Sequence, residues 1–228
     1  MATERQTSIL QHLIRHERLE VTQLSELLDV SPSTVRRELK IMEQSGLLVR
    51  AHGTARLPTP IHYELPYEKR AARQTEAKRQ IATAAKKLIK PGMVLGLSGG
   101  TTSTELARQL RPMKDLTIVT NAVNIALELQ GQAGKRVMVT GGLLNQNSYE
   151  LVGYQVTQSL RDVHLDVAFL GTSGLDLEFG FSMADEPEAV VARSFQTAAD
   201  KVVVMADHTK IGQATFARFC PLAEVDLL

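Results

Sequence analysis

The chain has 228 residues, of which 43% are hydrophobic and 22% are charged, and its formal net charge is +1 at pH 7. These values are ordinary for a soluble globular protein, and so small a net charge gives no global electrostatic argument for a nucleic-acid partner. No apolar run approaches the roughly 20 residues that span a bilayer, and the polar start lacks the apolar core of an export signal. Cys220 is the single cysteine, which excludes an internal disulfide and a zinc site built on cysteines. We therefore expect a cytoplasmic protein with no membrane partner.

Three short helices are expected at the start of the chain. The first covers residues 4–17, where apolar side chains recur on one face. After an extended link at Glu20-Val21, Thr22 is expected to cap a second helix, whose inward-facing side chains are Leu24, Leu27 and Leu28. Asp29-Val30 then turns the chain into a third helix. This spacing is typical of a helix-turn-helix, in which the third helix enters the major groove of DNA.

The stretch from Ser31 to Thr54, SPSTVRRELKIMEQSGLLVRAHGT, carries the strongest signal in the chain. Ser31 is a good N-cap, and Pro32 suits the first helical position because its missing N–H has no helical partner there. Residues at i, i+4 and i+7 form an apolar stripe for packing on other helices: Val35, Leu39 and Met42. Gly46 follows as a left-handed stop.

The opposite face of this third helix can donate hydrogen bonds to phosphates or base edges, through Ser33, Thr34, Arg36, Arg37 and Lys40. After the stop, Leu47–Val49 leads into a short ribbon with a basic tip at Arg50 and His52. Residues 36–56 hold five basic and two acidic side chains, and a local cationic face is what phosphate contact requires. Residues 1–57 are therefore predicted to be a winged helix-turn-helix that binds double-stranded operator DNA. The predicted contact residues are Ser31, Ser33, Thr34, Arg36, Arg37, Lys40, Arg50 and His52. A plain three-helix bundle with a solvated basic face is the alternative.

Residues 58–70 are expected to be a linker, because three prolines favour an extended backbone there: Pro58, Pro60 and Pro66. A single long helix is expected from Glu68 to Ile89. Its buried side is formed by Ile81, Ala82, Ala85, Leu88 and Ile89. Its basic side chains are expected to be solvated, with contact to a partner as the alternative: Arg70, Arg73, Lys78 and Arg79.

From Pro91 onward, apolar β-branched runs alternate with segments of helical length. Strands are expected at residues 94–97, 116–120, 136–140, 166–170 and 201–206. Helices are expected at residues 103–111, 122–130, 153–162 and 187–199. This alternation predicts an α/β domain over residues 71–228, with a mainly parallel sheet and helices on both faces. In such sheets ligands bind outside the carboxyl ends of the strands.

The loop after the first of these strands could hold a phosphate. Its two glycines let backbone N–H groups approach a ligand, and its hydroxyls add donors at a helix N-terminus. The spacing is neither that of a Walker A loop nor that of a dinucleotide fingerprint, so a plain glycine turn before a helix remains the alternative. Other strand ends add an amide, a carboxylate and a lysine. The candidate ligand residues are Ser98, Gly99, Gly100, Thr101, Thr102, Thr104, Asn121, Asp176 and Lys210.

Together these motifs resemble those of the DeoR family of bacterial repressors over nearly the whole chain. The N-terminal resemblance is carried by Val30-Ser31, Thr34–Leu39, Gly46 and Arg50–Gly53, with mild departures at Glu38 and Thr54. The C-terminal resemblance, to the family's sensor domain, is carried by Lys78–Ala82, Gly100–Thr102, Thr120-Asn121, Gly141-Gly142, Gly153, Phe169–Gly171 and Asp207–Lys210. That domain is similar in fold to ribose-5-phosphate isomerase and glucosamine-6-phosphate deaminase.

The resemblance implies a repressor whose effector is a phosphorylated sugar, with no cofactor. It implies that Gly100, Thr101, Thr102 and Thr104 hold the phosphate, and that Asn121, Asp176 and Lys210 line the sugar pocket. Ser98 stands where many members carry Asp, which removes one acceptor for a sugar hydroxyl. A palindromic operator needs two recognition helices, so we expect a homodimer or homotetramer. Family members usually continue beyond Leu228, so a truncated or shortened member is expected.

An enzyme is the second hypothesis, namely a sugar-phosphate isomerase or deaminase that carries a DNA-binding domain. Such chemistry needs a carboxylate base near the carbon acid. The sequence offers Asp176, Glu178, Asp185, Glu186 and Glu188 in one region. No metal site is expected, because neither His164 nor His208 shares a ligand-like spacing with another histidine and a carboxylate.

Overall fold

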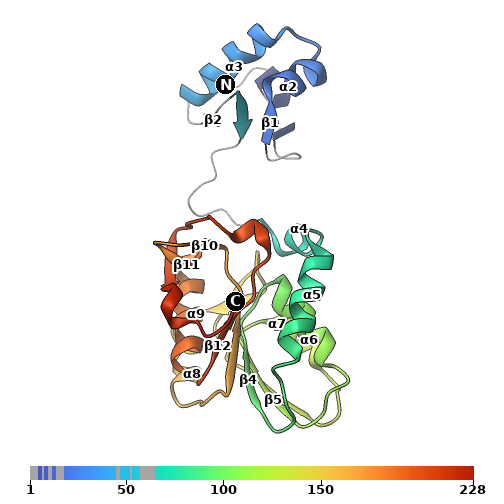
Figure 1. Ribbon diagram of the computed structural model, residues 1–228, viewed down its shortest axis with the longest axis vertical. Coiled ribbons are helices and arrows are strands. Elements are labelled where there is room, and N and C mark those ends of the chain that lie inside the picture. Colours follow the sequence, from blue (N-terminus) through green and yellow to red (C-terminus); the bar gives the residue numbers. More distant parts are fainter. Residues whose placement is uncertain are drawn as a thin grey trace. The chain divides into compact units, whose positions relative to one another are not determined.

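The computed structural model describes residues 5–6, 8–9, 12–13, 18–44, 47–51, 53–56 and 65–228. The chain divides into two compact units, residues 1–60 and 61–228 (Figure 1). Most of the helix expected over residues 4–17 lies outside the described residues, as do Gly46, His52 and the greater part of the expected linker.

The first unit packs two described helices, α2 (Val21–Leu28) and α3 (Pro32–Gln44), with a small antiparallel sheet. Its strands, β1 (Arg18–Glu20), β2 (Val49–Ala51) and β3 (Thr54–Arg56), are ordered β1-β3-β2. The buried core draws on each of these elements except β2: Ile9, Leu13, Leu19, Val21, Leu24, Val35, Leu39, Met42, Leu48 and Ala55. The expected wing therefore has a third strand, β1, which comes from the link between the first two helical segments.

Two local predictions in this unit were wrong. Helix α2 begins two residues earlier than expected, because its N-cap is Glu20 and not Thr22. The backbone N–H of Glu20 donates to Gln23 Oε1 at 2.9 Å. Leu27 is 48% exposed, because the eight-residue helix turns only Val21 and Leu24 fully into the core. The tight turn after α2 is confirmed, since Asp29 adopts a left-handed backbone with φ 51°.

The second unit is built on the predicted parallel sheet of five strands. The strands are β4 (Val94–Leu97), β5 (Leu116–Thr120), β6 (Lys135–Val139), β9 (Val167–Leu170) and β12 (Val202–Val204). Their order across the sheet is β12-β9-β4-β5-β6, and every neighbouring pair is parallel. All five agree with the sequence prediction to within two residues at each end.

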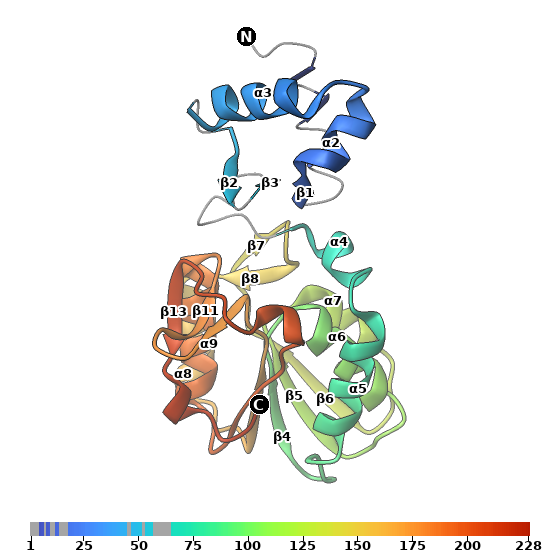
Figure 2. The ribbon, with the colours of Figure 1, turned by 45° about the horizontal axis from the view of Figure 1, so that its top comes forward.

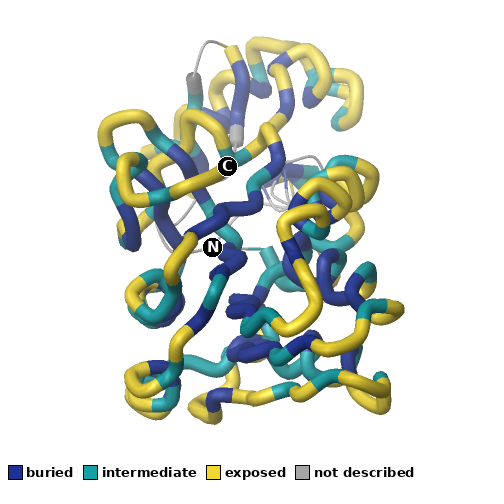
Figure 3. The backbone as a smooth tube through the Cα atoms, turned by 60° about the horizontal axis from the view of Figure 1, so that its bottom comes forward, coloured by how far each residue is buried: buried dark blue, intermediate teal, exposed yellow. Residues whose placement is uncertain are grey.

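Helices cover both faces of this sheet, as predicted. One face packs against α5 (Thr75–Lys86), α6 (Thr101–Leu110) and α7 (Val123–Leu129). The other packs against α8 (Tyr154–Arg161) and α9 (Glu186–Thr197) (Figure 2). Figure 3 shows the buried strands running through the interior of the unit, with exposed segments around them.

Five short antiparallel strands were not predicted. Strands β7 (Leu143–Asn145) and β8 (Glu150–Val152) form a hairpin. A separate sheet has the order β10-β11-β13, from β10 (Gly174–Asp176), β11 (Gly180–Met183) and β13 (Ala217–Cys220). This sheet packs with α9, and it ends in the buried Cys220, whose pKa is raised to about 11 by burial. Two 3-10 helices complete the unit, at His208–Lys210 and Leu222–Glu224.

The prediction of a single helix from Glu68 to Ile89 was also wrong. The segment forms α4 (Tyr67–Ala71) and α5, separated at Gln74, which has a left-handed backbone with φ 49°. Lys78 is buried at this break, and its ammonium donates to the carbonyl oxygens of Arg70 and Arg73. It therefore satisfies carbonyl groups in the last turn of α4 and just after it, instead of being solvated as expected.

Helix α4 is held against the loop of the β7–β8 hairpin. The Tyr67 N–H donates to the Asn147 carbonyl oxygen at 2.8 Å, and the rings of Tyr67 and Tyr149 lie 5.1 Å apart between centroids. The hydroxyl of Tyr149 donates to the Glu68 carboxylate. Residues 67–68, which lie within the expected linker, thus contact a hairpin far away in the sequence.

The break at Gln74 can be tested by a substitution. The free energy of unfolding should rise if the segment forms two helices and fall if it forms one. Gln74→Gly should raise the free energy of unfolding by about 0.5–1 kcal/mol, because glycine adopts a left-handed backbone without steric cost. Gln130→Gly is the matched control, since Gln130 is also exposed but has an ordinary φ of −60°. That control should lose a few tenths of a kcal/mol, roughly, through backbone entropy. Urea unfolding measures both changes, and a loss of about 1 kcal/mol for Gln74→Gly would indicate a continuous helix.

Candidate functional site

Helix α3 presents the predicted basic face to solvent. Ser33, Arg36, Arg37 and Lys40 are exposed and Thr34 is half-buried, while Val35, Leu39 and Met42 on the opposite face are fully buried. Ser31 caps the helix as predicted, because its Oγ accepts from the Thr34 N–H at 3.3 Å. That oxygen also lies 2.9 Å from each of the hydroxyls of Ser33 and Thr34. The hydroxyls at the start of α3 therefore form a small network at the end of the basic face.

The acidic residue on α3 that interrupts its basic sequence lies on the core side. Glu38 is buried, its Oε2 accepts from Gln6 Nε2 at 3.1 Å, and its Oε1 lies 3.6 Å from Arg5 Nη1. The charge of this carboxylate is thus directed toward residues 5–6. The exposed face of the helix keeps its cationic character.

Arg50 was predicted to contact DNA, and the structure places it in an ion pair. Its Nη2 and Nε lie 2.7 and 2.8 Å from Glu43 Oε2, and its backbone N–H donates to Glu43 Oε1 at 3.2 Å. These hydrogen bonds hold the pKa of Glu43 below its ordinary value. Arg50 therefore ties β2 to α3. His52, the other residue predicted at the tip of the wing, lies outside the described residues.

In the second unit, the order of the parallel strands reverses between β4 and β9, where ligands bind in open α/β sheets. The loops that follow these two strands are joined by Ser98. Its Oγ accepts from the Gly171 N–H at 3.1 Å, and its own N–H donates to the Phe169 carbonyl oxygen at 3.1 Å. Ser98 is only 3% exposed. Its hydroxyl thus holds the two loops together.

The glycine loop ends at the N-terminus of α6, as predicted. Gly100 is the N-cap, with φ 106°, and its carbonyl oxygen accepts from the backbone N–H and the hydroxyl of Thr104. Among the residues that the structure describes, no side chain caps this helix, so the N–H groups of its first turn are available to an anion. Thr104 is buried and its Oγ1 also accepts from Asn124 Nδ2 at 2.8 Å. The structure therefore places Thr101, Thr102 and Thr104 in the first turn of α6, with Thr104 bonded back to the glycine loop.

Asn121, which follows β5, is completely buried beside this loop. Its Nδ2 donates to Glu150 Oε2 and to the Leu151 carbonyl oxygen, both at 3.1 Å. Its Oδ1 is also buried and has no hydrogen-bond partner among the described residues. Glu150, from β8, packs over Gly99: a Cβ atom added to that glycine would lie 2.1 Å from Glu150 Cγ. Sequence reasoning missed Glu150, because nothing local to the hairpin indicates that it reaches the glycine loop.

Lys210 lies in the 3-10 helix that follows β12. It is close enough to Lys78 that the two charges repel, although burial is the main cause that lowers the pKa of Lys78. The buried Asp207 carboxylate acts in the opposite direction on that pKa, and its Oδ1 accepts from the Thr209 N–H at 2.9 Å. The structure thus adds Lys78, which the sequence had assigned to a solvated face, to the charges around Lys210.

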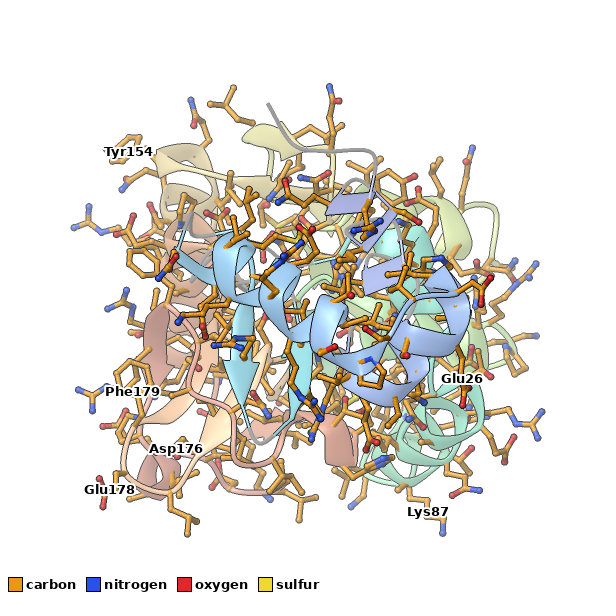
Figure 4. The ribbon with its side chains drawn as sticks, turned by 90° about the horizontal axis from the view of Figure 1, so that it is seen from above. Glu26, Lys87, Tyr154, Asp176, Glu178 and Phe179 are labelled. Carbon is orange, nitrogen blue, oxygen red and sulfur yellow. The ribbon has the colours of Figure 1, made fainter. Side chains whose placement is uncertain are left out.

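Asp176 makes its hydrogen bonds within its own hairpin. It ends β10 at the tip of the β10–β11 hairpin, where its Oδ1 accepts from the N–H groups of Glu178 and Phe179 at 2.9 and 2.8 Å. These two hydrogen bonds lower its pKa. Figure 4 shows the three residues together at the periphery. The side chain therefore stabilises the hairpin turn.

Other carboxylates in the second unit are tied to an amide. Asn145 Nδ2 lies 3.0 Å from Glu188 Oε1 and 3.5 Å from Asp185 Oδ2. Across the described part of the chain, no group of three or more histidine, cysteine or acidic residues is arranged to hold a metal ion. No described helix is long and apolar enough to cross a membrane.

Comparisons with known proteins match both units. The family model of the DeoR-like helix-turn-helix domain matches residues 5–60, and that of the DeoR C-terminal sensor domain matches residues 73–228. The HTH-type transcriptional repressor GlcR of Bacillus subtilis is 34% identical over 99% of this chain and 86% of its own. The HTH-type transcriptional regulator GlpR of Haloferax volcanii is 35% identical over 100% of this chain and 89% of its own.

Solved structures are similar to this chain in fold. The eIF2B delta subunit of Chaetomium thermophilum gives a TM-score of 0.50 at 19% identity, covering 68% of this chain and 56% of that one. Ribose 5-phosphate isomerase A of Methanocaldococcus jannaschii gives a TM-score of 0.45 at 17% identity, covering 60% and 54%.

Two buried serines at the glycine loop should respond oppositely to the same substitution. Ser98→Ala should lower the free energy of unfolding by about 1–3 kcal/mol, because the partly buried Gly171 N–H loses its acceptor. Ser103→Ala should be neutral or stabilising, since the Ser103 Oγ is buried without a partner among the described residues. Urea unfolding of both variants makes the comparison. Equal losses would mean that the Ser98 hydrogen bond does not join the loops.

Proposed function

The chain belongs to the DeoR family, and on that basis we propose that it is a transcriptional repressor whose operator affinity is changed by a phosphorylated sugar. Residues 1–57 would form the DNA-binding domain, residues 58–70 the linker and residues 71–228 the sensor domain. The match of both family models, one to each unit, is the observation that carries this proposal.

Operator contact is assigned to the exposed face of α3. Arg36, Arg37 and Lys40 can neutralise phosphates, and an arginine here can also donate two hydrogen bonds to a guanine edge. Ser31, Ser33 and Thr34 lie at the N-terminal end of the same helix, where backbone phosphates are commonly held. Arg50 contributes mainly by fixing the wing on α3 through Glu43. The tip of the wing, at His52, completes the proposed surface.

The effector site is assigned to the loops after β4, β5, β9 and β12. The phosphate would lie at the start of α6, on N–H groups around Gly100, Thr101 and Thr102. Ser98 and Thr104 would shape the loop, with Gly99 between them, while Asn121 and Lys210 would face the sugar. Asp176 has no direct part in this assignment, because the hairpin turn uses its carboxylate.

A change of operator affinity requires that the effector bind two conformations unequally. A palindromic operator also requires two recognition helices, so the proposed form is a homodimer or homotetramer.

A phosphorus NMR screen of sugar phosphates mixed with the full chain tests the effector site. Broadening or shifting of one phosphate signal, without new peaks, supports a sensor and identifies its effector. New peaks that grow with time would instead indicate the alternative function, a sugar-phosphate isomerase or deaminase.

Removing a charge from α3 should weaken operator binding. Arg36→Ala or Arg37→Ala should cost about 1–3 kcal/mol if that arginine reads a base, and should reduce the salt dependence by about one phosphate contact if it does not. Lys87→Ala, which removes an exposed charge from the second unit, is the control and should change neither quantity. An electrophoretic titration that finds unchanged affinity for both arginine variants would contradict the assignment of α3.

Variants at the sensor site should separate DNA binding from its regulation. Thr101→Ala and Lys210→Ala should bind operator with the affinity of the unmodified chain but need a higher concentration of the effector found by NMR. Lys201→Ala is the control for Lys210, because Lys201 is exposed at the opposite end of β12. Fluorescence anisotropy of labelled operator gives both affinities. A wild-type response from either site variant would show that the pocket is misplaced.

A further inference from the structure

Glu150 is a buried carboxylate beside the proposed phosphate site. It belongs to the β7–β8 hairpin, yet it is only 8% exposed and lies against the glycine loop. Any side chain at position 99 would displace it, because a Cβ atom there would fall 2.1–2.4 Å from its Cγ, Cδ and Oε1. Gly99 is therefore the residue that gives Glu150 room beside the start of α6.

Asn121 supplies a second, independent feature at the same place. Its amide nitrogen is bonded to Glu150 and to the Leu151 carbonyl oxygen, while its Oδ1 is buried without a partner among the described residues. A buried acceptor without a donor is unfavourable, so such an atom indicates a site that a ligand completes. The two side chains together offer hydrogen-bond acceptors next to a helix N-terminus that offers donors.

The charge of Glu150 decides which ligand suits this arrangement. A carboxylate beside a phosphate site disfavours a bare anion by repulsion between like charges. A molecule that carries donors next to its phosphate relieves this repulsion, because its hydroxyl or ammonium groups bond to the acceptors. Ser98 cannot take that part, since it has no carboxylate and its hydroxyl already accepts from Gly171.

We propose that Glu150 and Asn121 recognise the sugar of the effector, by accepting hydrogen bonds from its hydroxyl or ammonium groups. Glu150 is thus the specificity residue that distinguishes a phosphorylated sugar from inorganic phosphate. This inference rests on the proposed function, which puts the phosphate at the start of α6.

Isothermal titration of the full chain with inorganic phosphate and three sugar phosphates tests the proposal: glucose 6-phosphate, glucosamine 6-phosphate and ribose 5-phosphate. In Glu150→Gln, affinity for the best-bound sugar phosphate should fall about tenfold or more, because a hydrogen bond to a charged acceptor is lost. Affinity for inorganic phosphate should stay the same or rise, since the repulsion is removed. Glu178→Gln, on the exposed β10–β11 hairpin, is the matched control and should leave both affinities unchanged.

A ratio of sugar-phosphate to inorganic-phosphate affinity that is the same in Glu150→Gln and the unmodified chain would overturn the proposal. If the unmodified chain bound all four probes equally, the phosphate site would stand and this inference alone would fail. If it bound none of them, the effector site itself would be misplaced and the inference would fail with it.

A further variant decides the result if Glu150→Gln does not fold. Glu150→Asp retains the charge but shortens the reach of the side chain. It should lose sugar-phosphate affinity while keeping affinity for inorganic phosphate. Unchanged sugar-phosphate affinity in Glu150→Asp would overturn the proposal.

Discussion

The loops of the second unit are positioned by one hydrogen bond, at the point where the order of the parallel strands reverses. The Gly171 N–H donates to Ser98 Oγ and joins the loops that leave β4 and β9. Those loops belong to strands on either side of the switch point, so their separation fixes the width of the crevice between them. Because Ser98 is buried and its oxygen is engaged, the start of α6 is held in place before any ligand arrives. A preformed site of this kind loses little conformational entropy on binding.

Local patterns predicted much of the fold. Strands β4 and β5 agree with the expected ranges at both ends, because a strand buried on both faces is a continuous apolar run between turns. Helix α3 was predicted equally well, since Ser31, Pro32 and the stripe of Val35 act within a few residues of one another. The placement of the glycine loop at a helix N-terminus also followed from such short-range signals.

Contacts between distant residues could not be predicted in the same way. No proline or glycine marks the break before α5 at Gln74. The sequence predicted a solvated Lys78, because it does not show that the carbonyl groups of Arg70 and Arg73 lie within reach of its ammonium. Nothing in the sequence around Glu150 indicates that folding brings it against Gly99. Asp176 was predicted to line the sugar pocket, whereas its carboxylate accepts hydrogen bonds from the turn after β10. For Glu150 the deciding partner, Gly99, is absent from the local sequence.

Cys220 gives the second unit an internal reporter of local opening. It is the only thiol in the chain, it is buried in β13, and its pKa is raised to about 11 by burial. At neutral pH the reactive thiolate is therefore scarce, so alkylation of the folded chain will be slow. Opening of the β10-β11-β13 sheet would expose the thiol and restore its ordinary reactivity. The rate of labelling at this single position therefore measures how often the sheet opens, without any substitution in the chain.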